Sequence, residues 1–375
     1  MLEDATTPTQ SAPGHSGIPR YVRFVLLVIP LLCAALCRWQ VEDVTLSKDS
    51  RAYLRMARDM TGQVWYPPLY PLLLRATQAS VSAPHKIAIL NAVLLAALCA
   101  AVVYWYSATR AHWLIAAGIP IFLTLAGPFI YVYRWAWSEP LCLLCMMLWL
   151  ICLHYAVTTR SISYLIASAL FAASAAMTRY AGISLILVGC AAFLAWAPHR
   201  RFLRATAYGL VAATPVAAWL ARNMLTAHTA TGRSITFERP TAKSLYGFFV
   251  TGCDWLWPAT RTVAGSLQFA LGVVAWAVLL SACFVALRRS LRGYTPLRLL
   301  ALSILIYLAL SFATRCLADH ALPFDNRLLV PIYLALILAA GGLADSAVRW
   351  MMARTASADK QCPDEQRTET TDAHR

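Results

Sequence analysis

The sequence predicts an all-α integral membrane protein. Of its 375 residues, 60% are hydrophobic and only 13% are charged, and the mean hydropathy is +0.59. A soluble domain carries about 25% charged residues. A chain with half that share has too few polar side chains to cover a water-soluble surface. Apolar stretches close to the length that crosses a bilayer, about 20 residues, recur along the chain.

These stretches predict ten membrane-spanning helices, at 21–37, 87–106, 112–131, 138–157, 161–177, 181–197, 203–221, 266–287, 299–316 and 327–348. Only Thr178, Arg179 and Tyr180 separate the fifth stretch from the sixth, so residues 161–197 form either two spans or one broken span. The polar residues 1–19 and 351–375 are expected to be disordered tails on either side of a multi-span domain at 20–350.

The charge pattern predicts the orientation, because cytoplasmic loops of membrane proteins are enriched in Lys and Arg. With the N-terminus inside, arginine groups such as Arg200, Arg201 and Arg204 fall on the cytoplasmic side. Both termini are then cytoplasmic. Most acids fall on the other side, together with three long or unusual segments, at 38–86, 222–265 and 315–326. The net charge of +15 therefore reflects the orientation of the chain in the membrane. Nucleic-acid binding is not indicated, because no basic stretch carries a nucleic-acid-binding module.

The first external segment carries a helical pattern. Between Ser50 and Met60 apolar residues recur at helical spacing, and Arg51, Arg55 and Arg58 fall on the opposite face. This predicts an amphipathic helix lying on the membrane surface.

Asp49 begins that helix, where the helix dipole favours a carboxylate. It is either an N-cap or a functional acid. The run from Tyr66 to Pro71, Tyr-Pro-Pro-Leu-Tyr-Pro, then breaks the chain before a short apolar stretch at 72–81.

Charged residues also stand at span ends on the acidic side. Arg179 and Arg327 lie there, where a charge is costly to keep, and Arg222 opens the 222–265 segment. Arginine binds phosphate through two parallel hydrogen bonds; the alternative is that each side chain only reaches the membrane interface. Glu139, at the start of the fourth span, is either an ordinary first-turn acid or a second functional carboxylate that holds a divalent ion or an acceptor.

Several short motifs follow one another on the non-cytoplasmic side. They are Asp49-x3-Tyr53, the Tyr66–Pro71 run, Trp137-Ser138-Glu139-Pro140-Leu141, Thr178-Arg179-Tyr180-Ala181-Gly182 and Asn326-Arg327-Leu-Leu-Val-Pro331. In this order they resemble the GT-C glycosyltransferases, and within these the protein O-mannosyltransferase-like and RgtA/B/C/D-like bacterial branch. The resemblance extends over residues 21–348.

The resemblance implies a GT-C-like helical bundle in the inner (plasma) membrane of the cell. It further implies transfer of a sugar from a polyprenyl-phosphate donor to a hydroxyl of a glycan, lipid or protein acceptor. A carboxylate of the first external segment, Glu42, Asp43 or Asp49, would take the proton of that hydroxyl. Asp49 and Glu139 would be catalytic, and the substrates would be bound by Tyr53, Tyr66, Tyr70, Arg179, Tyr180, Arg222 and Arg327.

Two other classes of function compete with this interpretation. A transporter or lipid flippase would need charged residues in mid-span or broken helices in matching halves, whereas most charges here stand at span ends. A non-catalytic membrane assembly factor would keep the fold without needing Asp49. No cofactor is required by the motifs, and the use of a divalent metal ion is left open.

The topology is directly testable. Reporter fusions after Arg110, Arg204 and Arg292 are expected to report the cytoplasm, because these arginines mark the loops that the positive-inside rule places there. A fusion near Lys243 is expected to report the opposite side. A cytoplasmic signal at Lys243 would contradict both the orientation and the side assigned to the active site.

Overall fold

A computed structural model of the chain describes residues 20–41, 44–61, 65–109, 111–197, 199–232, 236–256, 265–288, 295–317 and 323–361. The first-segment acids Glu42 and Asp43 lie outside the described residues, as do the tails 1–19 and 362–375. Almost all of the described chain is helical. Its one pairing of extended backbone is an isolated bridge between Thr45 and Trp135.

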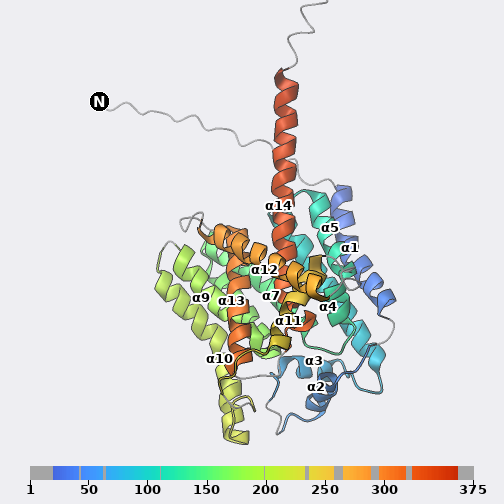
Figure 1. Ribbon diagram of the computed structural model, residues 1–375, viewed down its shortest axis with the longest axis vertical. Helices are drawn as coiled ribbons and strands as arrows, with labels where there is room; N and C mark the ends of the chain where they lie inside the picture. The colour runs from blue at the N-terminus through green and yellow to red at the C-terminus, as the bar shows by residue number, and fades with distance from the viewer. Residues whose placement is uncertain are drawn as a thin grey trace, which may run out of the picture.

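The helices follow one another along the chain as shown in Figure 1. In order they are α1 (Arg20–Gln40), α2 (Lys48–Arg58), α3 (Leu69–Ala76), α4 (Pro84–Ala108), α5 (Trp113–Leu125), α6 (Gly127–Tyr133), α7 (Glu139–Thr159), α8 (Ile162–Thr178), the 3-10 turn η1 (Tyr180–Gly182), α9 (Ile183–Trp196), α10 (Arg201–Ala227), α11 (Ala242–Leu256), α12 (Gly265–Arg288), α13 (Pro296–Leu317) and α14 (Asn326–Gln361).

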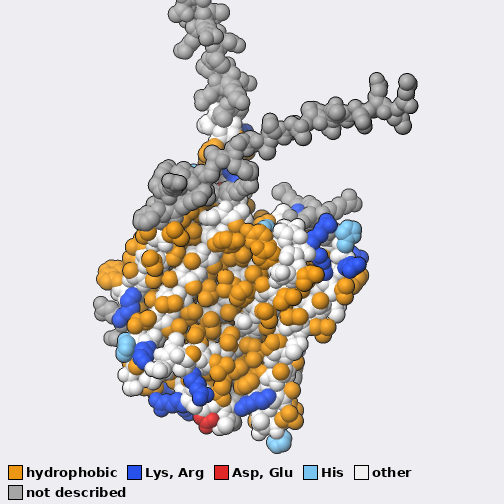
Figure 2. Space-filling view, turned by 180° about the vertical axis from the view of Figure 1, so that it is seen from behind, with side chains coloured by type: hydrophobic (Ala, Val, Ile, Leu, Met, Phe, Trp, Pro, Cys, Tyr) orange, Lys and Arg blue, Asp and Glu red, His pale blue; other side chains and the backbone are white. Residues whose placement is uncertain are grey.

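The centre of the bundle is formed by α4, α7 and α14. Most of the apolar stretch of each is buried, 67% in α4, whereas only 17% of that of α12 is buried. α14 packs against α5, α6, α7 and α13, while α8, α9 and α10 pack against one another beside α7. α12 therefore lies at the periphery and exposes apolar side chains such as Val274, Val278 and Phe284. On the face shown in Figure 2, apolar side chains cover a broad band, with Lys and Arg gathered toward its lower and upper right edges.

By length and composition, five of the described helices can cross a membrane, namely α4, α7, α12, α13 and α14. A sixth span is formed if α5 and α6, which meet at a 60° bend, count as one. Each of the ten predicted ranges does contain helix. Four of the ten predicted spans are not reached. The apolar helices Leu26–Gln40 of α1, α8 and Tyr180–Trp196 have at most 17 residues, which rise about 26 Å, less than the roughly 30 Å hydrocarbon core. α10 has 27 residues but is not apolar enough to count as a span.

Residues 161–197 form two helices and not one. Arg179 adopts an extended conformation (φ −149°, ψ 136°) that ends α8. The chain then reverses through η1, where the Gly182 N–H donates to the Arg179 carbonyl at 2.8 Å. A Cβ on Gly182 would lie 2.4–2.5 Å from the backbone of Ala175 and Ala176. The turn can therefore close against α8 only with glycine at this position.

The amphipathic helix of the first external segment is present as α2, and its arginines 51, 55 and 58 are exposed as predicted. Its apolar face, which includes Tyr53, Leu54 and Met56, does not lie free for the membrane but is buried within the protein. α3 covers part of it, and the Tyr53 ring meets the Tyr70 ring edge-on at 5.2 Å. α2 and α3 lie at the end of the bundle opposite the projecting C-terminal part of α14 (Figure 1).

Two parts of the chain are more helical than predicted. The 222–265 segment contains the last turn of α10 and the whole of α11, which packs on α12. The expected disordered tail at 351–375 is helical as far as Gln361, because α14 continues without interruption. No proline or glycine occurs between Gly342 and Gln361, and Pro363 follows shortly after, where a helix would end.

The turn at Gly182 yields a stability prediction. Gly182→Ala places a methyl group against backbone that cannot move aside, so it should lower the stability by about 1–3 kcal/mol, as overpacking does. Gly118→Ala in α5 is the matched control, because its new Cβ would meet nothing within 4 Å. The measurement is the thermal unfolding midpoint in detergent. Equal midpoints for the two variants would show that the turn does not need its glycine.

Candidate active site

A cavity of about 240 Å³ opens beside α2, between the α8–α9 turn and the facing ends of α13 and α14. Its polar lining comes from several separate parts of the chain and includes Asp49, Arg179, Asp325 and Arg327. The volume is somewhat smaller than that of most small-molecule sites, about 300–1,000 Å³. The remaining lining residues are Tyr53, Trp65, Tyr66, Pro67, Thr178, Tyr180, Ala181, Leu310, Ser311, Thr314, Pro323 and Leu328.

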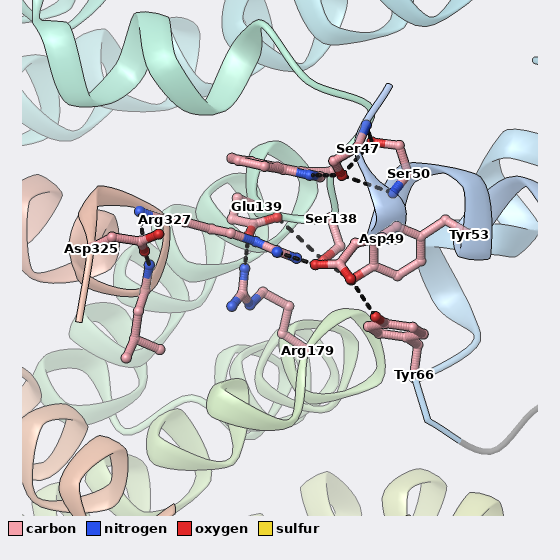
Figure 3. A network of polar contacts seen from close by, with 12 residues as sticks. Ser47, Asp49, Ser50, Tyr53, Tyr66, Ser138, Glu139, Arg179, Asp325 and Arg327 are labelled. Carbon is pink, nitrogen blue, oxygen red and sulfur yellow. Dashed lines mark hydrogen bonds and ion pairs between the residues drawn. The ribbon is translucent and has the colours of Figure 1, made fainter. Parts of the chain in front are cut away.

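An ion network lies at the base of this cavity. Arg327 pairs with Glu139 through Nε and with Asp49 through Nη1, and Arg179 pairs with Glu139 through Nη1. The Glu139 side chain is only 2% exposed, so it would be costly to keep without these partners. Figure 3 shows the four side chains pointing toward one another from α2, α7, the α8–α9 turn and α14.

α2 is held over the network by its own N-terminus. Ser47 is the N-cap, and Ser47 and Ser50 form a reciprocal capping box. The Trp137 indole N–H donates to the Ser47 hydroxyl at 2.8 Å, and the Tyr53 and Ser138 hydroxyls are hydrogen-bonded at 3.0 Å. Asp49 is thus not the cap, contrary to one of the two interpretations of the sequence. Its carboxylate is free to face the arginines.

The segment before α7 is fixed from both sides. The Asn91 side-chain amide donates to the carbonyls of Tyr133 and Trp135, at 2.8 and 3.0 Å. The Thr45 N–H donates to the Arg134 carbonyl at 3.0 Å. These bonds place Trp137, whose ring lies under the Arg327 guanidinium at 4.5 Å. Such a cation–π contact adds to the restraint on the guanidinium plane.

The start of α14 is positioned by Asp325 and by α11. Asp325 Oδ1 accepts hydrogen bonds from the backbone N–H groups of Arg327 and Leu328, at 3.0 and 3.2 Å. The Trp255 indole N–H donates to the Asn326 side chain at 2.8 Å. The Thr251 hydroxyl donates to the Phe324 carbonyl at 3.0 Å. The described residues of the 222–265 segment therefore support the site without lining the cavity.

Asp49 is a carboxylate with both oxygens engaged. Oδ1 accepts from the Tyr66 hydroxyl at 2.6 Å, and Oδ2 faces Arg327. Burial alone would raise the pKa of Asp49, but the Tyr66 hydrogen bond and the Arg327 pair outweigh burial and lower it. Burial and the hydrogen bond to Asp49 raise the pKa of Tyr66 well above its usual value, so that Tyr66 remains a donor.

The pKa of Asp325 is shifted in the opposite direction. Burial raises its pKa, against the backbone hydrogen bonds and the nearby Arg327 and Arg179, which lower it. The charges of the described site explain why Asp325 lacks an ion pair of its own. Asp49, Glu139 and Asp325 are three carboxylates, and Arg179 and Arg327 are two guanidiniums. Two carboxylates are neutralised by direct ion pairs, and Asp325 is left as the third.

The two arginines keep donors for a ligand. A guanidinium has five N–H donors. The ion pairs engage Nε and Nη1 of Arg327 and Nη1 of Arg179. Both side chains line the cavity and are 19% and 15% exposed. Further donors of the same groups are available to an anionic ligand, and phosphate matches guanidinium geometry.

The donor set does not fit a divalent cation. Mg²⁺ and Ca²⁺ are bound by carboxylate and carbonyl oxygens. Here Asp49 and Glu139 already face guanidinium groups, which would repel a cation. Within the described ranges no three His, Cys, Asp or Glu side chains come together in a metal-binding arrangement. The predicted role of Glu139 as a possible metal ligand therefore has no geometric support, and Glu139 instead holds the two arginines.

Most of the residues predicted from the sequence meet at this site, but two do not. Asp49, Glu139, Arg179 and Arg327 form the network, and Tyr53, Tyr66 and Tyr180 line the cavity. Tyr70 is fully buried beneath Tyr53 and does not line the cavity. Arg222 also lies apart, because its guanidinium donates to the Met60 carbonyl at 2.8 Å and stacks on Trp219.

The sequence interpretation missed several contributors. Trp137 and Ser138 belong to a motif in which only Glu139 was assigned a role. Asp325 directly precedes the Asn326-Arg327 pair, and an acid just before a helix is a usual cap position. Ser311 and Thr314 stand one turn apart on the largely apolar α13 and both line the cavity. This polar pair at helical spacing is the signal that would have revealed them.

No family model, no curated protein and no solved structure matches the chain.

The pKa of Asp49 predicts how stability depends on pH. A lowered pKa in the folded state means that the Asp49 charge stabilises the fold above the ordinary Asp pKa of about 3.9. That contribution is lost as the pH falls through the lowered pKa. Asp49→Asn should thus cost about 1–3 kcal/mol at pH 7, the scale of charge-assisted hydrogen bonds. The deficit should shrink below about pH 4.

The measurement is the thermal midpoint of the two proteins as a function of pH. Asp59→Asn is the control, because Asp59 is an exposed acid at the other end of α2 whose carboxylate accepts hydrogen bonds from Thr61. It should have a much smaller effect at pH 7. A deficit for Asp49→Asn that stays constant down to pH 2 would contradict the pairing with Arg327.

Proposed function

We propose that the protein is a membrane glycosyltransferase that moves a sugar from a polyprenyl-phosphate-linked donor to an acceptor hydroxyl on the non-cytoplasmic face. The observation that carries the proposal is the pair Arg179 and Arg327, held side by side by Glu139 in a cavity beside the ends of α13 and α14. An arginine pair in this position suits a phosphate whose lipid tail lies in the membrane.

The lining of the cavity matches the remaining parts of such a substrate. Trp65, Tyr66 and Tyr180 offer aromatic surface, and the hydroxyl-bearing Ser311 and Thr314 add polar groups. A small number of polar groups in an aromatic and apolar pocket is the usual composition of a site for an organic ligand. Leu310 and Ala181 add apolar lining where α13 approaches the α8–α9 turn.

The chemistry needs little beyond these groups. The leaving group is a lipid phosphate, which is stable as an anion. Its departure is therefore assisted by positive charge, and Arg179 and Arg327 supply it. The acceptor hydroxyl must lose a proton as it attacks the anomeric carbon, and a carboxylate in the cavity takes that proton.

The direct test uses purified protein incubated with labelled undecaprenyl-phosphate esters of glucose, galactose, mannose and arabinose. Thin-layer analysis is expected to show label leaving at least one of the four carriers. It appears as free sugar when water is the acceptor, or as a new product when a membrane extract is added. Failure to bind undecaprenyl phosphate, together with no release from any carrier, would contradict the proposal and favour a transporter or an assembly factor.

Substitution of the arginines should act on donor binding. Arg179→Lys and Arg327→Lys retain the charge but lose the two parallel hydrogen bonds, so each should weaken donor affinity at least tenfold, about 1.4 kcal/mol. Arg222→Lys is the matched control, since Arg222 lies outside the cavity. Binding is measured with undecaprenyl phosphate by microscale thermophoresis. Unchanged affinity in both Lys variants would reduce the two arginines to interface anchors.

A further inference from the structure

The carboxylates of the cavity differ in what their oxygens contact. Asp49 engages one oxygen with Tyr66 and the other with Arg327. Glu139 is almost fully buried, pairs with both arginines and does not line the cavity. A base must have an oxygen lone pair directed at the proton it takes, within hydrogen-bond reach. At Asp49 an incoming hydroxyl would share each oxygen with a donor already bound there, Tyr66 or Arg327, and Glu139 does not line the cavity at all.

Asp325 has such an oxygen. Its Oδ1 accepts both backbone hydrogen bonds at the start of α14, and its Oδ2 has no hydrogen-bond partner among the residues that the structure describes. Asp325 lines the cavity together with Arg179 and Arg327, next to the position proposed for the phosphate. Figure 3 shows it on the side of Arg327 opposite Asp49, anchored through the start of the helix.

We propose, on the basis of the proposed function, that Asp325 Oδ2 is the general base that deprotonates the acceptor hydroxyl. The acceptor oxygen forms its bond to the anomeric carbon as the bond from that carbon to the phosphate oxygen breaks. The electron pair of the broken bond leaves with the lipid phosphate, beside Arg179 and Arg327. The hydroxyl proton passes to Asp325 Oδ2 and then to solvent or to the released phosphate.

Asp49 then has a different role. With both oxygens engaged, it is a positioning residue that holds the Arg327 guanidinium from the side of α2. The electrostatics agree with this division. The pKa of Asp49 is lowered, which makes it a weak base, whereas burial raises the pKa of Asp325 and makes it a better proton acceptor near neutral pH. Two carboxylates with pKa values moved apart commonly serve separate roles.

The competing explanation is that Asp325 only caps α14. Substitutions separate the two, because Asn keeps an oxygen for the backbone N–H groups but cannot take a proton. Asp325→Asn should therefore retain the thermal midpoint and the undecaprenyl phosphate affinity of the parent, while transfer falls by about 10²–10⁴. Asp325→Glu should restore part of the rate. Asp325→Ala should lose both the rate and some stability.

The test measures release of label from the carrier that the parent protein uses, at limiting donor and across pH 4–9. The parent rate should fall on the acid side with a midpoint above the ordinary Asp pKa of about 3.9, because the base must be unprotonated. Asp325→Asn should lack this acid limb. Asp49→Asn should keep it while showing weaker donor binding. Asp59→Asn, outside the cavity, should behave as the parent.

The outcomes distinguish the inference from the function on which it rests. If the parent binds no undecaprenyl phosphate and releases no label, the proposed function itself is wrong. If the parent is active and Asp325→Asn works at a similar rate with the same acid limb, Asp325 is only a cap. If Asp49→Asn instead loses both the rate and the acid limb at unchanged donor affinity, Asp49 is the base.

Discussion

The pairing of Glu139 with Arg179 and Arg327 is the interaction on which the site depends. Glu139 is almost fully buried, and a carboxylate in that position without cationic partners would cost several kcal/mol. The two arginines come from the α8–α9 turn and from the start of α14, far apart in sequence. Satisfying one buried charge therefore ties three regions of the bundle together and leaves the outer sides of both guanidiniums toward the cavity.

Specific local features of the surrounding elements position each charged side chain of this network. Gly182 allows the reversal that presents Arg179, since any Cβ there would meet the backbone of α8. The Ser47–Ser50 capping box and the Trp137–Ser47 bond hold α2 so that Asp49 reaches Arg327. Trp137 also provides the surface on which Arg327 lies. Preorganised positive charge of this kind stabilises a leaving anion without rearrangement at the moment of reaction.

The same network explains why the three acids of the site have different partners. Three carboxylates share two guanidiniums, and one of them, Asp325, makes no direct ion pair within the described site. Asp49 and Glu139 take the pairs because α2 and α7 place them within reach. Asp325 is instead held by backbone N–H groups, which fix one oxygen and leave the other toward the cavity. An acid that is positioned by the backbone and lacks a cation of its own is suited to exchange protons.

Composition and hydropathy alone determined the helical membrane class, and local pattern determined α2 with its exposed arginines, as well as the polar residues at span ends. These are properties of neighbouring residues, so a sequence reveals them. Only the tertiary structure decided that Arg222 and Tyr70 lie outside the site, that Ser47 and not Asp49 is the cap, and that Asp325 belongs with Arg327. Arg222 meets Met60 across 162 positions of chain, and Asp49 meets Arg327 across 278, contacts that no local pattern specifies. Which oxygens remain for Asp325 depends on how the buried charges of the bundle have found their partners.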